Sequence, residues 1–96
     1  MSELRVVFLG TSSGKPTPSR NLAAVALTLD GAMVLFDCGE GTQLQFPRAG
    51  AKASRLEVAC ITHFHGDHIN GLPGFLSTLG LNQHEKAVHV TGPTGL

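Results

Sequence analysis

Apolar residues in the first 40 positions fall into short runs that are separated by turn-forming residues. The runs at 4–9, 22–29 and 32–37 are rich in Val, Leu and Phe and predict three β-strands. Asp30-Gly31 separates the last two runs, as is typical of a two-residue hairpin. Residues 10–21 contain Gly, Ser and Pro and predict a loop, and connections of this length are often functional.

The pattern changes after the third predicted strand. Residues 42–46 predict the start of a short helix, which we expect Pro47 to end because proline lacks the N–H that a helix interior needs. A polar connector at 50–55 follows, and residues 57–61 predict another short strand. A helix and a strand therefore follow the initial hairpin.

A longer helix is predicted near the end of the chain by four apolar residues with the spacing of one helix face. They are Leu72, Phe75, Leu76 and Leu79. Pro73 fits the first turn of this helix and Gly80 can end it. Residues 87–91 predict a final strand. The order of elements indicates a mixed α/β fold without an internal repeat.

The predicted strands are apolar on both faces, which one well-formed helix cannot cover. The chain has 96 residues, and its last predicted strand is followed only by a turn signal, Gly92-Pro93. Hydrophobic residues make up 42% of the chain and charged residues 15%, which excludes a disordered protein. We therefore expect residues 1–96 to form the N-terminal part of a larger α/β domain.

Charge and targeting signals narrow the class of protein. Seven basic residues balance seven acidic residues, so the net charge gives no support for nucleic-acid binding. The chain contains neither a signal peptide nor an apolar run of the roughly 20 residues that a membrane helix needs. We expect a cytoplasmic protein without a membrane partner. Cys38 and Cys60 are too few for a disulfide framework and are expected to be buried, reduced thiols.

Residues 62–68 read Thr-His-Phe-His-Gly-Asp-His and contain the ligand types that Zn²⁺ prefers. His63 and His65 are two positions apart and point the same way in an extended segment. Gly66 permits a change of direction, after which Asp67 and His68 face a second position. The loop follows a strand and precedes a helix, where α/β folds place their sites. The spacing thus predicts two neighbouring metals.

Two simpler interpretations of this cluster fit the sequence less well. A single loop histidine is usually a surface residue, but four candidate ligands within six positions are improbable by chance. A closed structural zinc site favours cysteine, and neither cysteine lies in the cluster. The remaining histidines outside the cluster, His84 and His89, are interpreted as structural or surface residues.

The segment from His63 to His68 has the HxHxDH signature and resembles the metallo-β-lactamase superfamily. Four further stretches make the chain similar to the ribonuclease Z family of tRNA 3′-processing endonucleases. These are Phe8–Thr17 with Arg20-Asn21, Phe36–Gln43, Gly71–Gly74 and Thr91–Pro93. The resemblance extends over nearly the whole chain, in order.

The resemblance implies an αββα sandwich with two zinc ions at the sheet edge, of which residues 1–96 form the N-terminal part. It implies that His63 and His65 bind one zinc and that Asp67 and His68 bind the other. Hydrolysis would remove the 3′ trailer of precursor tRNA, and Asp67 would also act catalytically by moving a proton. The full-length protein would be a homodimer.

Three further residues receive roles from this resemblance. Asp37 matches an aspartate that supports a ligand histidine in the correct tautomer, although it can also be a simple turn residue. Lys15 and Arg20 lie in the loop at 10–21 and become candidates for contacts with RNA phosphates, or else solvated loop charges. Gly10 to Lys15 superficially resembles a P-loop, but its glycines are too close and Pro16 replaces the required Ser or Thr.

The remaining ligands of the family, two histidines and a bridging aspartate, lie downstream of residue 96. We expect the 96 residues alone to lack activity. Pro47 departs from the family, which usually has a longer helix there. Two alternatives stay open: another hydrolase of this fold, such as a phosphodiesterase or an arylsulfatase-like enzyme, or a non-catalytic interaction module.

Overall fold

The computed structural model describes residues 3–12, 21–82, 84 and 87–96. The first three strands, β1 (Leu4–Gly10), β2 (Ala24–Leu29) and β3 (Ala32–Phe36), form an antiparallel meander. Two strands, β4 (Leu56–Cys60) and β5 (His89–Thr91), then add in parallel to give the order β1-β2-β3-β4-β5. The turn between β2 and β3 has positive φ at Asp30 and Gly31, as the hairpin signal predicts.

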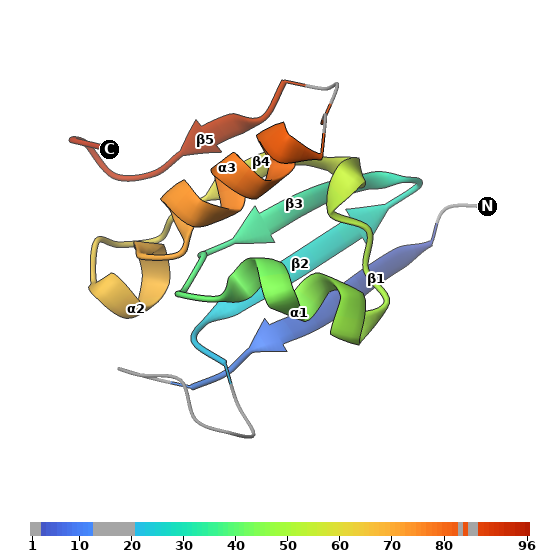
Figure 1. Cartoon of the computed structure of the whole chain (residues 1–96), viewed down its shortest axis with the longest axis horizontal. Coiled ribbons are helices and arrows are strands. Elements are labelled where there is room, and N and C mark those ends of the chain that lie inside the picture. The colour runs from blue at the N-terminus through green and yellow to red at the C-terminus, as the bar shows by residue number, and fades with distance from the viewer. Residues whose placement is uncertain (1–2, 13–20, 83, 85–86) are drawn as a thin grey trace.

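The helical segments lie in the two parallel crossovers. Helix α1 (Thr42–Ala49) and the 3₁₀ turn η1 (Ala53–Arg55) connect β3 to β4. A single turn, α2 (Gly66–Ile69), and helix α3 (Leu72–Leu81) connect β4 to β5. Figure 1 shows α1 and α3 on the same face of the sheet, with α2 beyond the carboxyl ends of β3 and β4. None of the described helices is long and apolar enough to cross a membrane.

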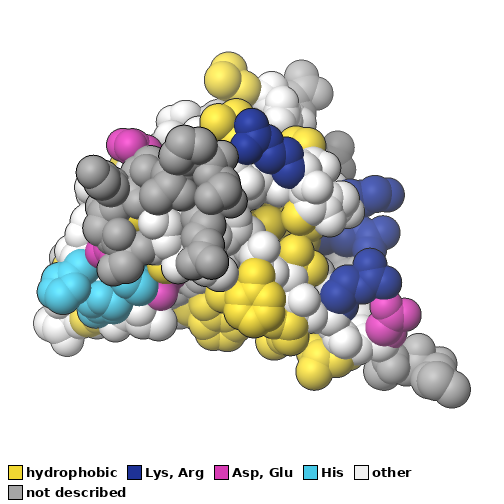
Figure 2. All heavy atoms as spheres, turned by 90° about the horizontal axis from the view of Figure 1, so that it is seen from below, with side chains coloured by type: hydrophobic (Ala, Val, Ile, Leu, Met, Phe, Trp, Pro, Cys, Tyr) yellow, Lys and Arg dark blue, Asp and Glu magenta, His cyan; other side chains and the backbone are white. Residues whose placement is uncertain are grey.

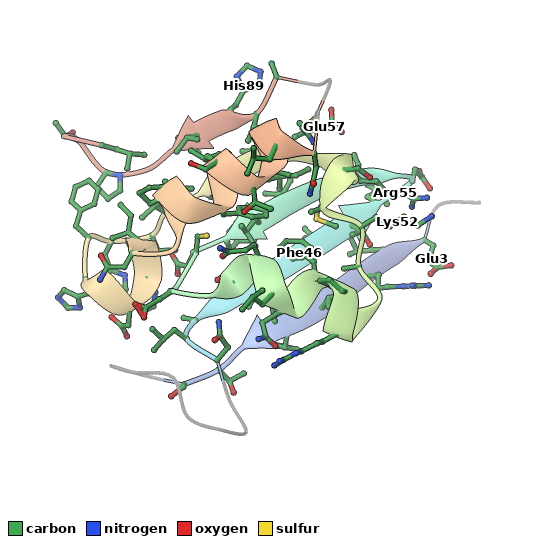
Figure 3. The ribbon with its side chains drawn as sticks, viewed as in Figure 1. Glu3, Phe46, Lys52, Arg55, Glu57 and His89 are labelled. Carbon is green, nitrogen blue, oxygen red and sulfur yellow. The ribbon has the colours of Figure 1, made fainter. Side chains whose placement is uncertain are left out.

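The core lies between the sheet and the two longer helices. Ala26, Leu35 and Ala59 face it from three neighbouring strands and are fully buried. Phe46 of α1 stacks on Phe75 of α3 with ring centroids 5.2 Å apart and an angle of 10° between the rings. Figure 3 shows Phe46 between α1 and α3. This pair fixes the two helices against each other.

The expectation that Pro47 ends the first helix is wrong. Helix α1 continues through Pro47 to Ala49. Proline there removes only one intrahelical hydrogen bond, whereas the stacked Phe46 side chain, 2% exposed, holds the helix on the core. The helix closes at Gly50, in the left-handed conformation, whose N–H donates to the carbonyls of Phe46 and Pro47. Tertiary packing therefore outweighs the local effect of proline.

The face of the sheet that lies opposite the helices is apolar. It presents alternate residues of β1, β2 and β3, and no helix in the described part of the chain lies on it. Its most exposed large side chains are Leu4, Val6, Phe8, Leu29 and Phe36. Figure 2 shows hydrophobic side chains gathered between the histidines at one end and most of the visible Lys and Arg side chains toward the other. The structure thus contains one covered and one open apolar sheet face.

Candidate metal centre

The predicted metal loop lies at the carboxyl ends of β3 and β4, and backbone hydrogen bonds join it to the segment after β3. The N–H of Asp37 donates to the Cys60 carbonyl at 2.8 Å, and the N–H of Cys38 donates to the His68 carbonyl at 2.8 Å. The Gly71 N–H donates to the Cys38 carbonyl at 2.9 Å. Two loops far apart in sequence are therefore held as one unit.

Two glycines make this close contact between the loops possible. A Cβ atom at Gly71 would lie 2.0 Å from the carbonyl oxygen of Gly39. A Cβ atom at Gly39 would in turn lie 2.4 Å from Leu22 Cβ and 2.7 Å from the Asp67 carbonyl oxygen. Because the neighbouring atoms are mainly backbone, a side chain at either position would separate the loops.

The three histidines of the loop lie together. The ring centroids of His63 and His65 are 4.6 Å apart in an edge arrangement, and those of His63 and His68 are 3.9 Å apart. Their spacing along the chain predicts that His65 and His68 lie on opposite sides of a change in direction. The structure forms that change with α2, a helical turn that the sequence pattern did not predict, with His65 as its N-cap residue.

Asp37 organises the cluster from the end of β3. It is 8% exposed, and its φ of 63° is uncommon for a residue other than glycine, although aspartate tolerates it better than most. Its Oδ2 lies 2.8 Å from His68 Nδ1, and its Oδ1 accepts a hydrogen bond from the Thr62 N–H at 2.8 Å. This contact to a ring nitrogen is the arrangement expected of a residue that fixes a histidine tautomer.

Asp67 lies in the first turn of α2. Its Oδ2 is 3.5 Å from His68 Nε2, and both side chains are largely buried. The same imidazole ring therefore has Asp37 at Nδ1 and Asp67 near Nε2. The assignment of Asp67 and His68 to one metal, which the spacing predicts, stays a prediction.

The donor set fits zinc in its chemistry. Imidazole nitrogen and carboxylate oxygen are zinc ligands, and the His68 ring has its Nδ1 side occupied by Asp37 so that Nε2 faces Asp67. Among the described residues, no three His, Cys, Asp or Glu side chains are arranged to hold one metal ion. A division of two ligands to each ion does not require such a group of three. The division of these ligands into two pairs stays a prediction.

The RNA-contact candidates Lys15 and Arg20 lie outside the described residues. The base of their loop is described: the Ser12 N–H donates to the Asn21 carbonyl at 2.8 Å, and Asn21 Nδ2 donates to the Glu40 carbonyl at 3.1 Å. The loop therefore starts and ends beside the segment that carries Asp37.

The other singled-out side chains lie as expected for structural or surface residues. His89 is exposed on β5 and is directed away from the sheet in Figure 3. His84 Nε2 contacts the Leu56 carbonyl at 3.2 Å. Cys38 and Cys60 are free thiols; Cys38 is buried as expected, whereas Cys60 is only half-buried. Burial raises the pKa of Cys38 to about 11, an effect that a hydrogen bond with Thr42 opposes.

The sequence pattern assigns no role to Thr62. Its hydroxyl lies 3.0 Å and 2.9 Å from the two carboxylate oxygens of Asp37 and 2.9 Å from His63 Nδ1. The only signal in the sequence is a hydroxyl residue directly before the first histidine. A contact over 25 positions, between Thr62 and Asp37, cannot be read from that pattern.

Comparisons with known sequences show which family this chain matches. The family model described as anti-Pycsar protein Apyc1 matches residues 4–93. A ribonuclease Z from Synechococcus sp. (strain WH7803) is 53% identical over 97% of this chain and 29% of its own length. Another from Prochlorococcus marinus (strain MIT 9301) is 48% identical over 97% of this chain and 30% of its own length. The chain thus spans about 30% of the length of these relatives.

Solved structures give the same fold. Human tRNase Z, short form, superposes with a TM-score of 0.87 and 45% identity, covering 99% of this chain and 36% of that one. The metallo-β-lactamase fold protein YhfI from Bacillus subtilis has a TM-score of 0.82 at 18% identity, covering 96% of this chain and 39% of that one, and supports the fold alone. The chain therefore belongs to the family described as anti-Pycsar protein Apyc1, has a partial metallo-β-lactamase fold and corresponds to the N-terminal portion of ribonuclease Z.

Proposed function

We propose that this chain is part of a zinc-dependent endoribonuclease that removes the 3′ trailer of precursor tRNA by hydrolysing a phosphodiester. The observation that carries the proposal is the cluster of His63, His65, Asp67 and His68, which Asp37 holds at the sheet edge. The ribonuclease Z relatives support the choice of substrate, since they match over 97% of this chain.

In this proposal, His63 and His65 hold one zinc, and Asp67 and His68 hold the other. Two zinc ions would lower the pKa of water and neutralise charge that develops on the phosphate. Asp67 has a second role in this proposal: its carboxylate, whose Oδ2 lies 3.5 Å from His68 Nε2, would accept a proton during the reaction. Asp37 keeps the His68 ring in position throughout.

The rest of a longer protein is proposed to supply the remaining ligands and to be needed for activity. With two ligands for each ion, the chain alone would bind zinc weakly and activate water poorly. The whole protein is proposed to be a cytoplasmic homodimer.

Lys15 and Arg20 are proposed to contact phosphates of the tRNA acceptor end, because the base of their loop lies beside the Asp37 segment. Replacing either with Ala should raise KM for precursor tRNA several-fold and reduce its salt dependence, with little change in kcat. Lys52→Ala is the matched control, since Figure 3 places Lys52 at the end of the molecule away from α2. An equal rise in KM in all three variants would contradict these contacts.

The function is tested by incubating the whole protein, loaded with zinc, with a 3′-extended precursor tRNA and separately with a small phosphodiester such as bis(p-nitrophenyl) phosphate. We expect cleavage of the precursor at its 3′ trailer. Hydrolysis of the small diester without any RNA cleavage would instead support another hydrolase of this fold. This alternative is tested because the matching family model is described as anti-Pycsar protein Apyc1 and not as ribonuclease Z. Absence of both activities would support a non-catalytic module.

A further inference from the structure

We infer that Thr62 is a positioning residue that fixes the ring of His63 by relaying the orientation imposed by Asp37. This inference deepens the proposed function, on which it rests. It begins from a hydrogen-bonded chain of four side chains: His63, Thr62, Asp37 and His68. The three contacts between neighbours in this chain have lengths from 2.8 to 3.0 Å.

The number of protons available decides the direction of each hydrogen bond. A carboxylate only accepts, and a threonine hydroxyl has one proton to donate. The Thr62 hydroxyl lies within 3.0 Å of both Asp37 oxygens, so it donates there. Its oxygen then accepts from His63 Nδ1 at 2.9 Å. The reverse arrangement would place the hydroxyl oxygen against the carboxylate without a proton between them.

The tautomer of His63 follows from this direction. With its proton on Nδ1, the neutral ring has a lone pair on Nε2, which is the atom free to bind a metal. His68 reaches the same state directly, since its Nδ1 lies 2.8 Å from Asp37 Oδ2. One buried carboxylate thus prepares two histidines, one directly and one through Thr62.

This shared anchor connects the two halves of the proposed metal centre. His63 and His68 are assigned to different zinc ions, yet their ring centroids are 3.9 Å apart and both rings depend on Asp37. The Thr62 backbone also participates, because its N–H donates to Asp37 Oδ1 at 2.8 Å. Loss of the Thr62 hydroxyl should therefore affect His63 and leave the direct contact of His68 intact.

His65 provides an internal comparison. Within the described part of the chain its ring packs against His63, and no hydrogen bond to it is observed. Because no described residue fixes either ring nitrogen, both tautomers should be populated.

The test is long-range ¹⁵N–¹H NMR of the metal-free protein with labelled histidines, at about pH 8.5, above the ordinary histidine pKa of about 6.5. In the unmodified protein we expect His63 and His68 to carry their proton on Nδ1. In Thr62→Val, His63 should lose this preference while His68 keeps it. Thr62→Ser, which retains the hydroxyl, should restore the original pattern.

Zinc affinity is the second measurement. Thr62→Val should weaken binding of one zinc about 10- to 100-fold, as is typical when the partner of a ligand histidine is removed, and Thr62→Ser should not. A proton on Nε2 of His63 in the unmodified protein would overturn the inference without the need for any variant. An unchanged His63 tautomer in folded Thr62→Val would also overturn it. If the tautomers are as expected but no RNA is cleaved, only the proposed function fails.

Discussion

Cys38 lies inside the backbone contact that joins the two loops of the candidate site. Its side chain is completely buried, and burial raises the pKa of the thiol from 9.0 to about 11. A raised pKa keeps the thiol neutral at physiological pH, and only the thiolate reacts readily. Cys38 is therefore expected to be inert despite its position beside Asp37.

This expectation is tested by alkylation of the whole protein with iodoacetamide in a Cys60→Ser background, with mass spectrometry of the peptide that contains Cys38. Labelling of the folded protein should be slow at pH 8. Its rate should rise about tenfold per pH unit without levelling off before pH 10, because the thiolate fraction keeps increasing up to the raised pKa. In urea, where the thiol is exposed, labelling should be fast and level off nearer the ordinary pKa of 9.0. A plateau below pH 9 in the folded protein would contradict this effect of burial.

Individual residues of the site show which contacts the sequence can predict and which it cannot. The motif from His63 to His68 predicts the metal cluster because its ligands are close along the chain. The role of Asp37 follows only from the family resemblance, because its contact with His68 spans 31 positions. Thr62 received no role, since its partners depend on how β3 and β4 align. Contacts across the sheet edge are a product of tertiary structure that local spacing does not encode.

Among the secondary-structure elements, the loop after β3 and the start of α3 cross in close backbone contact near the site. Gly71 precedes α3, and a Cβ atom there would lie 2.0 Å from the Gly39 carbonyl oxygen. Gly80 lies near the other end of the same helix, where an added Cβ would meet no atom within 4 Å. The two glycines thus differ in the space around them, although both belong to the same helix and its cap.

Gly71→Ala should destabilise the protein by more than about 2 kcal/mol, on the order of the cost of overpacking at a backbone contact. Gly80→Ala, the matched control, should stabilise it by about 0.5–1 kcal/mol because alanine favours the helix. Urea unfolding of the whole protein measures both. Equal effects of the two substitutions would show that the loop crossing does not need a glycine.

Local pattern predicts the elements that have strong signals and misses those that depend on packing. The apolar runs of β1 to β3, the Asp30-Gly31 turn and the apolar face of α3 all correspond to observed structure. Helix α1 passes Pro47 because Phe46 stacks on Phe75, a partner 29 positions away. The single turn of α2 has too few residues to produce a periodic pattern.

Considered as a whole, the molecule has helices on one face of its sheet and an open apolar surface on the other. Val6 is 51% exposed and Phe8 is 69% exposed, and both are on the strand β1. Large contiguous apolar surfaces are rare on stable monomers and usually mark an interface. The expectation that the 96 residues form only part of a larger α/β domain stays a prediction, and it would account for this surface.

The 96-residue chain expressed alone should therefore bind a hydrophobic dye, self-associate and unfold without a sharp transition. Replacing both Val6 and Phe8 with Thr should reduce dye binding and association, because Thr keeps strand propensity while adding a polar group. Leu81→Thr is the control, since Leu81 is 84% exposed but lies at the end of α3, away from this face. A monomeric chain with a sharp thermal transition and no dye binding would contradict the expectation.

The central claim is that His63, His65, Asp67 and His68 supply half of a two-zinc centre. The zinc content of the purified whole protein tests this claim most directly. It is measured after dialysis by inductively coupled plasma mass spectrometry. The proposal predicts about two zinc ions per chain in the unmodified protein and in His89→Ala, whose imidazole is exposed on β5. His65→Ala and His68→Ala should each lose at least one zinc and the cleavage of precursor tRNA. Full zinc content and activity in either variant would contradict the ligand assignment.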